Sequence, residues 1–362
     1  MKANFFKCFF IMSMIAMFTA CNEDDPGNGN TPEGSNIVTI TEDISEVTTW
    51  YADSLYVIKQ YDFYVGNSLT IQPGTVIKFT TDGPYLLLGS SGTIIANGTA
   101  EKPIVFTSYK DDNSGGDTNG DGDATQPARK DWGGIGTNSY NGSVFNHCRF
   151  LYGGDNSYGY TLEVYGDNIK VTNSTFAHNA GDDETGWYGA LNANYAEQNC
   201  VITGNVFYDN IRPMSVSTAI GIDNSNIFHD PDNPGTLNTY NAIFIESTND
   251  FANTISWEED EVAFVIDDVD LWVRSGVSLT LGDGVVVKFR PGSRIVLADG
   301  PSTIVNHDGT GVYFTSYKDD SKKGDANGDG DATSPGPGDW EGIYDDVSST
   351  YMGWSNIYYA TN

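Results

Sequence analysis

Two short segments of the chain carry oxygen-bearing side chains on alternate residues. The first contains Asp117, Asn119, Asp121 and Asp123, with Gly122 between the last two. The second repeats the pattern with Asp325, Asn327, Asp329 and Asp331. Oxygen ligands at this spacing, with a glycine for the tight turn, are typical of loops that wrap around Ca²⁺. We therefore expect calcium to bind in both loops as a structural rather than a catalytic ion.

The pattern departs from that of an EF-hand, so some of the calcium ligands must come from other residues. The twelfth position, where an EF-hand has a bidentate glutamate, is Ala128 in the first segment and Gly336 in the second. No helical periodicity flanks either segment. Neighbouring aspartates could supply the missing ligands: Asp111, Asp112 or Asp131 in the first segment, and Asp319, Asp320 or Asp339 in the second. The alternative is an ordinary acidic turn without a metal.

A second group of residues suits sugar binding. The stretch between residues 152 and 195 is rich in tyrosine and tryptophan, set among glycine, asparagine and aspartate. Aromatic faces stack on sugar rings, and neighbouring amides and carboxylates hydrogen-bond the sugar hydroxyls. The alternative is that these rings pack loops over the core. The candidate glycan-binding residues are Tyr158, Tyr160, Trp187 and Tyr188.

Catalytic residues cannot be identified from the sequence. A polyuronate lyase needs a cation to neutralise the substrate carboxylate and a base to remove the α-proton. Arg149, Lys170 and Arg212 are the candidates, but they are more readily explained as ordinary surface cations. A glycoside hydrolase needs two carboxylates at a defined separation, and no such pair can be assigned. We name no catalytic residue.

The elements that must position these groups are short β-strands. Apolar runs of three to five residues, such as Tyr85 to Leu88 and Ile104 to Phe106, are too short for amphipathic helices. Turn-forming steps, among them Pro73-Gly74 and Asn97-Gly98, separate them. The chain is therefore expected to be all-β.

A recurring unit indicates how the strands assemble. Phe150, Phe176, Phe207 and Phe228 are spaced by 26, 31 and 21 residues. An asparagine precedes each phenylalanine by two to four residues, at positions 146, 173, 205 and 226. Units of this length are typical of the coils of a solenoid, in which equivalent side chains stack about 4.8 Å apart. We expect one phenylalanine ladder and one asparagine ladder.

A long duplication runs through the chain and accounts for the two acidic segments. The copies are offset by 210 residues early and by 208 residues later. We expect one β-helix over residues 37–362, with copies at about 45–150 and 255–360. The matching pairs are Leu69 to Phe79 with Leu279 to Phe289, Phe106 to Asp112 with Phe314 to Asp320, Gly116 to Thr125 with Gly324 to Thr333, and Asp131-Trp132 with Asp339-Trp340.

Two of these segments carry a family resemblance. Leu69 to Lys78, followed by Ala96 to Ser108, resembles a large family of exported bacterial parallel β-helix repeat proteins. The resemblance covers roughly residues 45–360 and implies a right-handed parallel β-helix with long acidic loops. The wider superfamily includes pectate lyases and polygalacturonases. Gly181-Asp182-Asp183 resembles one polygalacturonase element, but the companion Asn-Thr-Asp and Gly-His-Gly elements are absent. The resemblance therefore implies a fold and leaves the activity open.

The N-terminus resembles that of an exported lipoprotein. Lys2 and Lys7 precede an apolar stretch of about ten residues, too short to span a bilayer. Phe18-Thr19-Ala20-Cys21 is similar to a lipobox, which implies a signal peptide over residues 1–20 and a lipid on Cys21. Residues 21–36 would form a flexible tether. The acidic residues after Cys21 resemble a tag for display on the outer face of the outer membrane.

The net charge of the chain limits the classes of molecule that can bind to its surface. The formal charge of −31 becomes −33 when the two lysines of the signal peptide are removed. Such a surface repels nucleic acids, anionic lipids and polyuronates, unless divalent cations bridge the carboxylates. Membrane contact is expected only through the lipid anchor. We expect a calcium-stabilised surface lipoprotein that binds extracellular polysaccharide or another surface component without catalysis. The alternatives are a polysaccharide lyase or hydrolase, and an adhesin or structural stalk.

Overall fold

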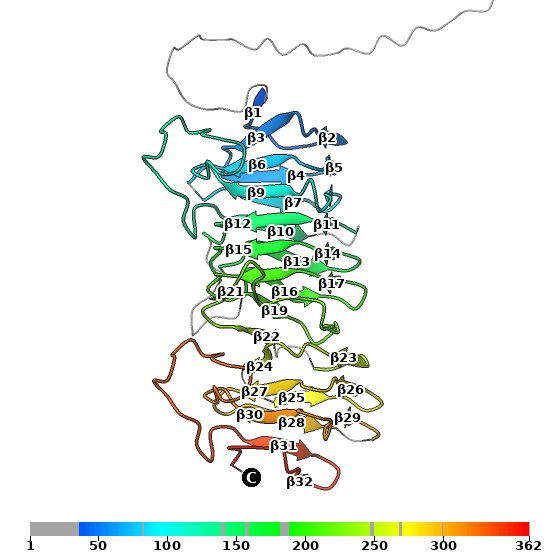
Figure 1. Ribbon diagram of the computed structural model, residues 1–362. Coiled ribbons are helices and arrows are strands. Elements are labelled where there is room, and N and C mark those ends of the chain that lie inside the picture. The colour runs from blue at the N-terminus through cyan, green and yellow to red at the C-terminus, as the bar shows by residue number, and fades with distance from the viewer. Residues whose placement is uncertain are drawn as a thin grey trace, which may run out of the picture.

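The chain folds into an elongated stack of coils, which the computed structural model places in one column from β1 to β32 (Figure 1). The structure describes residues 36–81, 83–138, 142–155, 159–181, 188–246, 250–267, 270–298 and 300–361. Within these residues the regular elements are all strands. No helix in this part of the chain is long and apolar enough to cross a membrane. The predicted signal peptide, Cys21 and the tether lie outside the described residues, apart from Asn36, with which β1 begins.

Three parallel sheets form the faces of the N-terminal coils. The 7-stranded sheet contains β1 (Asn36–Ile40), β3 (Ser54–Ile58), β6 (Val76–Phe79), β9 (Ile104–Ser108), β12 (Cys148–Leu151), β15 (Thr175–Ala177) and β18 (Val206–Tyr208). The 6-stranded sheet contains β2 (Thr48–Trp50), β5 (Ser68–Ile71), β8 (Thr93–Asn97), β11 (Val144–Asn146), β14 (Lys170–Thr172) and β17 (Val201–Thr203).

The third sheet has ten strands and runs through both copies of the duplication. It contains β4 (Asp62–Val65), β7 (Tyr85–Leu88), β10 (Gly134–Asn138), β13 (Leu162–Gly166), β16 (Leu191–Ala196), β19 (Met214–Val216), β22 (Ala242–Glu246), β24 (Ala263–Asp267), β27 (Val286–Phe289) and β30 (Tyr313–Ser316).

Smaller sheets complete the C-terminal coils. One contains β23 (Ile255–Trp257), β26 (Ser278–Leu281) and β29 (Thr303–Val305). Another contains β25 (Asp270–Val273), β28 (Arg294–Leu297), β31 (Gly342–Asp345) and β32 (Thr350–Tyr351). Two strand pairs are antiparallel, β31–β32 and the hairpin of β20 (His229–Asp230) and β21 (Asn233–Leu237). All other strand pairs that the structure describes are parallel, as the predicted parallel β-helix requires.

Stacked phenylalanines fill the core, as the spacing predicted. The rings of Phe150, Phe176, Phe207 and Phe228 stack with centroid distances of 4.6, 5.1 and 5.3 Å. Phe106 extends the ladder at 5.1 Å from Phe150. All five side chains are fully buried. Each ring thus covers its neighbour, so that a coil buries apolar area that it could not bury alone.

The single asparagine ladder predicted from the sequence is wrong. Asn205 and Asn226 do stack, with Nδ2 of Asn205 3.1 Å from Oδ1 of Asn226. The neighbour of Asn205 in the preceding coil is Ser174, because its backbone N–H bonds Oδ1 of Asn205. Asn146 and Asn173 hydrogen-bond to each other in a separate row nearer the surface. These bends have the same length, because Asn146, Thr172 and Thr203 align with one another and each lies four residues before its aligned phenylalanine. The asparagines therefore occupy different positions within equal bends.

The two copies of the duplication are not related by a simple shift along the stack. β6 and β9 of the first copy belong to the 7-stranded sheet. Their counterparts in the second copy, β27 and β30, belong to the 10-stranded sheet. The change occurs in the middle coils. β18 is the last regular strand of the 7-stranded sheet, and β25 is the first strand of the 4-stranded sheet. The second copy therefore presents its duplicated strands on a different face.

Candidate functional site

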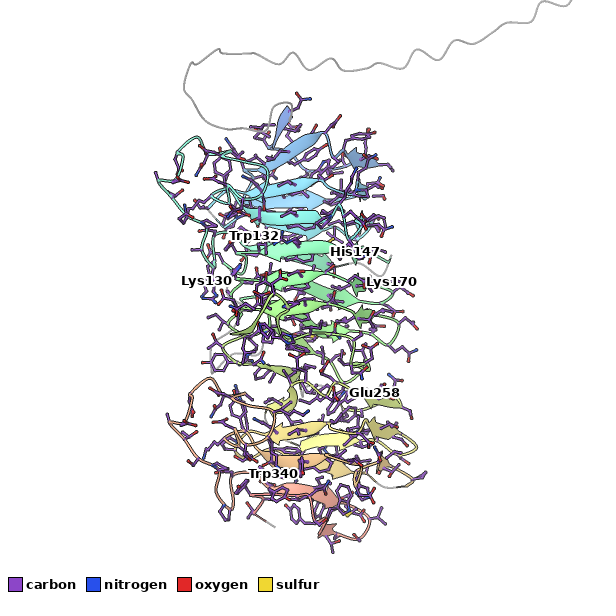
Figure 2. The ribbon with its side chains drawn as sticks, in the orientation of Figure 1. Lys130, Trp132, His147, Lys170, Glu258 and Trp340 are labelled. Atoms are coloured by element: carbon purple, nitrogen blue, oxygen red, sulfur yellow. The ribbon has the colours of Figure 1, made fainter. Side chains whose placement is uncertain are left out.

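Two long loops leave the stack at equivalent places in the two copies. We call residues 109–130, between β9 and β10, the first acidic loop, and residues 317–338, between β30 and β31, the second acidic loop. Both project from the same side of the column in Figure 1. Each loop ends beside a buried tryptophan, Trp132 or Trp340 (Figure 2). These rings stack on Phe79 at 4.1 Å and on Phe289 at 3.9 Å.

The base of each loop is closed by aspartates that already have partners. Asp111 accepts a hydrogen bond from Thr107 at 2.7 Å, and Asp131 accepts one from Ser108 at 2.6 Å. Lys110 pairs with Asp131 at 2.8 Å. These two aspartates therefore fix the loop base. The second copy repeats the contacts as Thr315–Asp319, Ser316–Asp339 and Lys318–Asp339.

Three other carboxylates converge within each loop. One oxygen from each lies within 4.8 Å of the others. The group is Asp112, Asp117 and Asp121 in the first loop and Asp320, Asp325 and Asp329 in the second. Of the neighbouring aspartates that the sequence offered, Asp112 and Asp320 are thus the ones that join the predicted residues.

Some oxygens of these groups are buried and have no protein partner. They are the Oδ1 atoms of Asp112 and Asp121 in the first loop. The Oδ1 atoms of Asp320 and Asp329 are in the same state in the second loop. Buried carboxylate oxygens without a donor are costly, and both copies of the duplication share this arrangement.

Asp117 is held in place by the turn around it. Its carboxylate accepts backbone N–H bonds from Gly122 at 2.8 Å, Gly120 at 2.7 Å and Asp121 at 3.2 Å. These bonds, Gly122 first, lower the pKa of Asp117 and keep it ionised. In the second loop, Asp325 accepts the equivalent bonds from Gly328 and Gly330.

The other predicted ligands have different places. Nδ2 of Asn119 donates to Oδ2 of Asp121 at 2.9 Å and to Thr125 at 3.1 Å, so Asn119 orients the carboxylate of Asp121. Asn327 makes the same two bonds to Asp329 and Thr333. The three-carboxylate groups include neither Asp123 nor Asp331.

Crowding of negative charge perturbs the loops. Partial burial, followed by the charge of the neighbouring Asp117, raises the pKa of Asp112. The same causes, with Asp325 as the neighbour, raise the pKa of Asp320 to about 6. A buried lysine lies beneath each loop: Lys78 donates to the carbonyl of Gly116 at 2.7 Å. Lys288 donates to Gly324 at 2.6 Å, and burial lowers its pKa to about 8. One lysine cannot neutralise three carboxylates.

A hollow of about 650 Å³ opens on the outer face of the 10-stranded sheet. Its floor follows one row of aligned residues, Tyr64, Leu87, Gly136 and Glu163, from four successive strands. Tyr64, Tyr165 and Tyr195 are 38–43% exposed, which leaves their faces open to a ligand. The full lining is Tyr64, Leu87, Leu88, Gly136, Tyr160, Glu163, Tyr165, Tyr188 and Tyr195.

Two of the predicted glycan-binding residues, Tyr160 and Tyr188, line this hollow. Tyr158 and Trp187 lie outside the described residues. The sequence did not single out Tyr64, Tyr165 and Tyr195 as a group. A usable signal exists in the strand Asp62–Val65, where exposed and buried residues alternate and place Tyr64 outward. Alternation alone does not say which strands lie side by side.

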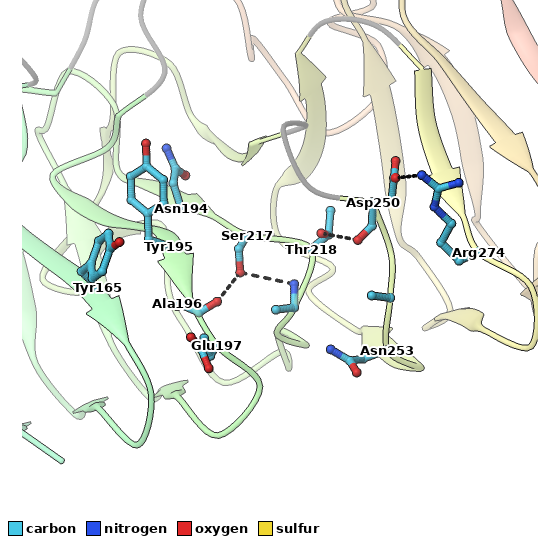
Figure 3. Close-up of a pocket in the computed structure, with 12 residues that line it drawn as sticks. Tyr165, Asn194, Tyr195, Ala196, Glu197, Ser217, Thr218, Asp250, Asn253 and Arg274 are labelled. Carbon is cyan, nitrogen blue, oxygen red and sulfur yellow. Dashed lines mark hydrogen bonds and ion pairs between the residues drawn. The ribbon is translucent and has the colours of Figure 1, made fainter. Parts of the chain in front are cut away.

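A second hollow of about 480 Å³ (Figure 3) shares two lining residues with the first. Tyr165 and Tyr195, whose ring centroids are 5.2 Å apart, line both hollows and separate them. The pairing of β13 with β16 is irregular between Glu163 and Tyr165, and such bulges re-aim side chains. Beyond the tyrosines, Asp250 forms an ion pair with Arg274 at the far wall.

The cations considered for lyase chemistry are not brought together. Lys170 begins β14 in the 6-stranded sheet, on the opposite side of the column from Trp132 in Figure 2. Arg149 lies in β12 of the 7-stranded sheet. Arg212 is fully buried, with its guanidinium 3.9 Å from the ring of Phe244. None of the three lines either hollow. Asp182 and Asp183 lie outside the described residues.

Comparison with known proteins supports the fold. Residues 42–137 match the model of the pectate-lyase-like beta helix domain. No curated protein matches the chain, and no solved structure does. The matched segment includes the strands from β2 to β9 and the first acidic loop. Together with the parallel sheets, the match identifies the chain as a parallel β-helix repeat protein whose residues 42–137 are similar to the pectate-lyase-like beta helix domain.

Proposed function

We propose that the protein binds extracellular polysaccharide through the two adjoining hollows of the 10-stranded sheet, without catalysis. The observation that carries this proposal is the concentration of tyrosines, five of which line the first hollow. Tyrosine offers a flat apolar face and a hydroxyl, which suit the CH face and the hydroxyls of a sugar ring. The pectate-lyase-like domain is consistent with a role linked to polysaccharide.

Enzymatic alternatives have less support from these residues. A glycosidase needs two carboxyl groups flanking the scissile bond. Among the described residues that line the first hollow, Glu163 is the one carboxyl group; the second hollow adds Glu197 and Asp250, of which Asp250 is paired with Arg274. A polyuronate lyase needs a cation near the substrate carboxylate. The described lining of the first hollow contains no lysine, arginine or histidine, and Arg274 in the second hollow is paired with Asp250.

Replacing the tyrosines that separate the hollows tests the proposal. Tyr165→Ala and Tyr195→Ala are each expected to weaken glycan binding about two- to tenfold, since a ring contact is worth roughly 0.5–1.5 kcal/mol. Tyr51→Ala is the matched control, because Tyr51 is 51% exposed and does not line either hollow. A glycan array would select the ligand, and calorimetry would give the affinities. Equal binding by all three variants would contradict the proposal.

We further propose that each acidic loop binds one calcium ion through its three-carboxylate group. The supporting observation is that the same buried aspartate oxygens lack a protein partner in both loops. Calcium prefers carboxylate and carbonyl oxygens and would neutralise the repulsion within each group. Its role would be to order the loop. Removal of the ion is therefore expected to lower the thermal stability of the protein.

Lipid attachment at Cys21 would display the hollows at the surface of the outer membrane. The lipobox resemblance over Phe18 to Cys21 supports this part of the proposal. Surface proteolysis of intact cells tests it: the protein should be accessible to added protease, and Cys21→Ala should leave the membrane fraction. An adhesin or stalk would share this location but would not depend on Tyr165 and Tyr195 for binding.

A further inference from the structure

Glu163 occupies the floor of the first hollow and is enclosed by polar neighbours. It lies on β13 in register with Gly136 of β10 and Asn192 of β16. Nδ2 of Asn192 donates to Oε1 of Glu163 at 3.2 Å, and the hydroxyl of Tyr160 also bonds this carboxyl group. A carboxyl group with two hydrogen-bonding neighbours is held in one orientation.

Gly136 leaves a gap directly in front of this carboxyl group. A methyl group at position 136 would lie 3.8 Å from Oε2 of Glu163 and from the hydroxyl of Tyr160. It would also lie 3.0 Å from Cδ2 of Leu87, which is closer than ordinary van der Waals contact, so an atom enters this gap only with a small shift of the Leu87 side chain. A glycine within a strand often marks a place where a ligand approaches the backbone closely. With a small shift of the Leu87 side chain, the gap therefore lets a small polar group reach Glu163 and Tyr160 between the surrounding tyrosine rings.

We infer that the first hollow binds neutral sugars rather than uronates, with Glu163 and Tyr160 hydrogen-bonding a hydroxyl group of one sugar ring in the gap at Gly136. This inference rests on the proposed glycan-binding function and specifies its ligand class. A uronate would bring a negative charge to a site whose described lining residues include no cation. The formal charge of −31 on the whole chain disfavours a polyanion further.

The protonation of Glu163 supports the same ligand class. Burial raises the pKa of Glu163 to about 7, and the hydrogen bond with Tyr160 offsets only part of this rise. Among the residues that the structure describes, the neighbours that face it are uncharged: Leu87 and Gly136 on one side, Asn192 on the other, and Tyr160. Below pH 7 the carboxyl group is neutral and can donate as well as accept. Above pH 7 it loses the donor and gains an unpaired charge.

Binding measured at two pH values tests this inference on the whole protein. The probes are neutral hexose oligosaccharides and oligogalacturonates of the same length. If only the neutral carboxyl group binds, the affinity for neutral glycans falls about thirtyfold from pH 5.5 to pH 8.5, because the competent fraction falls by that factor. Glu163→Gln should bind with little pH dependence. Glu101→Gln, an exposed control, should keep the wild-type profile. Gly136→Leu should fill the gap and abolish binding.

The outcomes separate the two proposals. A preference for oligogalacturonates that still depends on Tyr165 and Tyr195 would overturn the neutral-sugar inference and leave glycan binding intact. A pH profile for Glu163→Gln that matches wild type would also overturn it. Circular dichroism confirms that Gly136→Leu is folded, and binding by that folded variant would count against the gap as the subsite. Failure of every glycan to bind would overturn both proposals.

Discussion

Chelation of calcium is expected to lower the free energy of unfolding of the wild-type protein by about 5 kcal/mol. A site saturated at a hundred times its dissociation constant adds about 2.7 kcal/mol, and the chain has two such loops. Their contributions should add, since the duplication places the loops 208 residues apart on different coils. For a chain of this size the loss corresponds to a fall of about 10 °C in Tm. Differential scanning calorimetry with calcium and with chelator measures it.

Single substitutions assign the effect to the carboxylate groups. Asp121→Asn and Asp329→Asn should each remove about half of the calcium-dependent shift, and the double variant should remove nearly all of it. Asp123→Asn is the matched control, because it makes the same change of charge in the same loop outside the three-carboxylate group. An unchanged Tm on chelation of the wild type contradicts calcium binding. An equal loss in Asp123→Asn would point to general charge screening instead.

The loops and the core ladder could be predicted because each depends on residues close in sequence or on a regular repeat. The duplication places Thr107 and Asp111, or Thr315 and Asp319, four residues apart in both copies, and each pair closes a loop base. The phenylalanine spacing identified the ladder because a large apolar side chain has one place in a coil, the interior. Neither prediction required knowledge of which face a strand occupies.

The sequence could not predict which face of the stack each strand occupies. The duplication gives β6 and β27 matching sequences, yet they lie in different sheets. In the middle coils only isolated bridges continue two of the faces: Ile227 pairs with Val206 of the 7-stranded sheet, and Ile222 pairs with Trp257 of the 3-stranded sheet. The repeat alone carries no information about this rotation.

The tyrosine-lined hollow depends on the same missing information. Tyr64 and Tyr195 are 131 residues apart in the sequence and line one hollow. Their alignment requires the register of five strands to be correct at once. A shift of one residue in any strand would turn its outward side chains into the core. The sequence could therefore indicate aromatic residues near positions 160 and 188 but could not bring Glu163, Gly136 and Tyr64 together.

A buried asparagine ladder that the sequence did not reveal is expected to be a major source of stability. Asn210 is fully buried, and its Nδ2 donates to the carbonyl of Phe176 at 2.9 Å and to Oδ1 of Asn238 at 2.8 Å. Its Oδ1 accepts from the backbone N–H of Asn179 at 3.1 Å and from Nδ2 of Asn179 at 3.0 Å. Asn210→Ala leaves the Phe176 carbonyl and the Asn179 N–H without these partners. Each such buried group costs about 1–3 kcal/mol.

Asn210→Ala should therefore lower the free energy of unfolding by about 3–5 kcal/mol, measured by urea unfolding followed through tryptophan fluorescence. Asn97→Ala is the control, because Asn97 is exposed and accepts one side-chain hydrogen bond, from Asn146 at 2.8 Å. Water can replace that bond, so the control should lose less than about 1 kcal/mol. Similar small losses in both variants would show that the coils relax around Asn210. A large loss in Asn210→Ala alone would show that the ladder of Asn179, Asn210 and Asn238 stabilises the stack, as the phenylalanine ladder does.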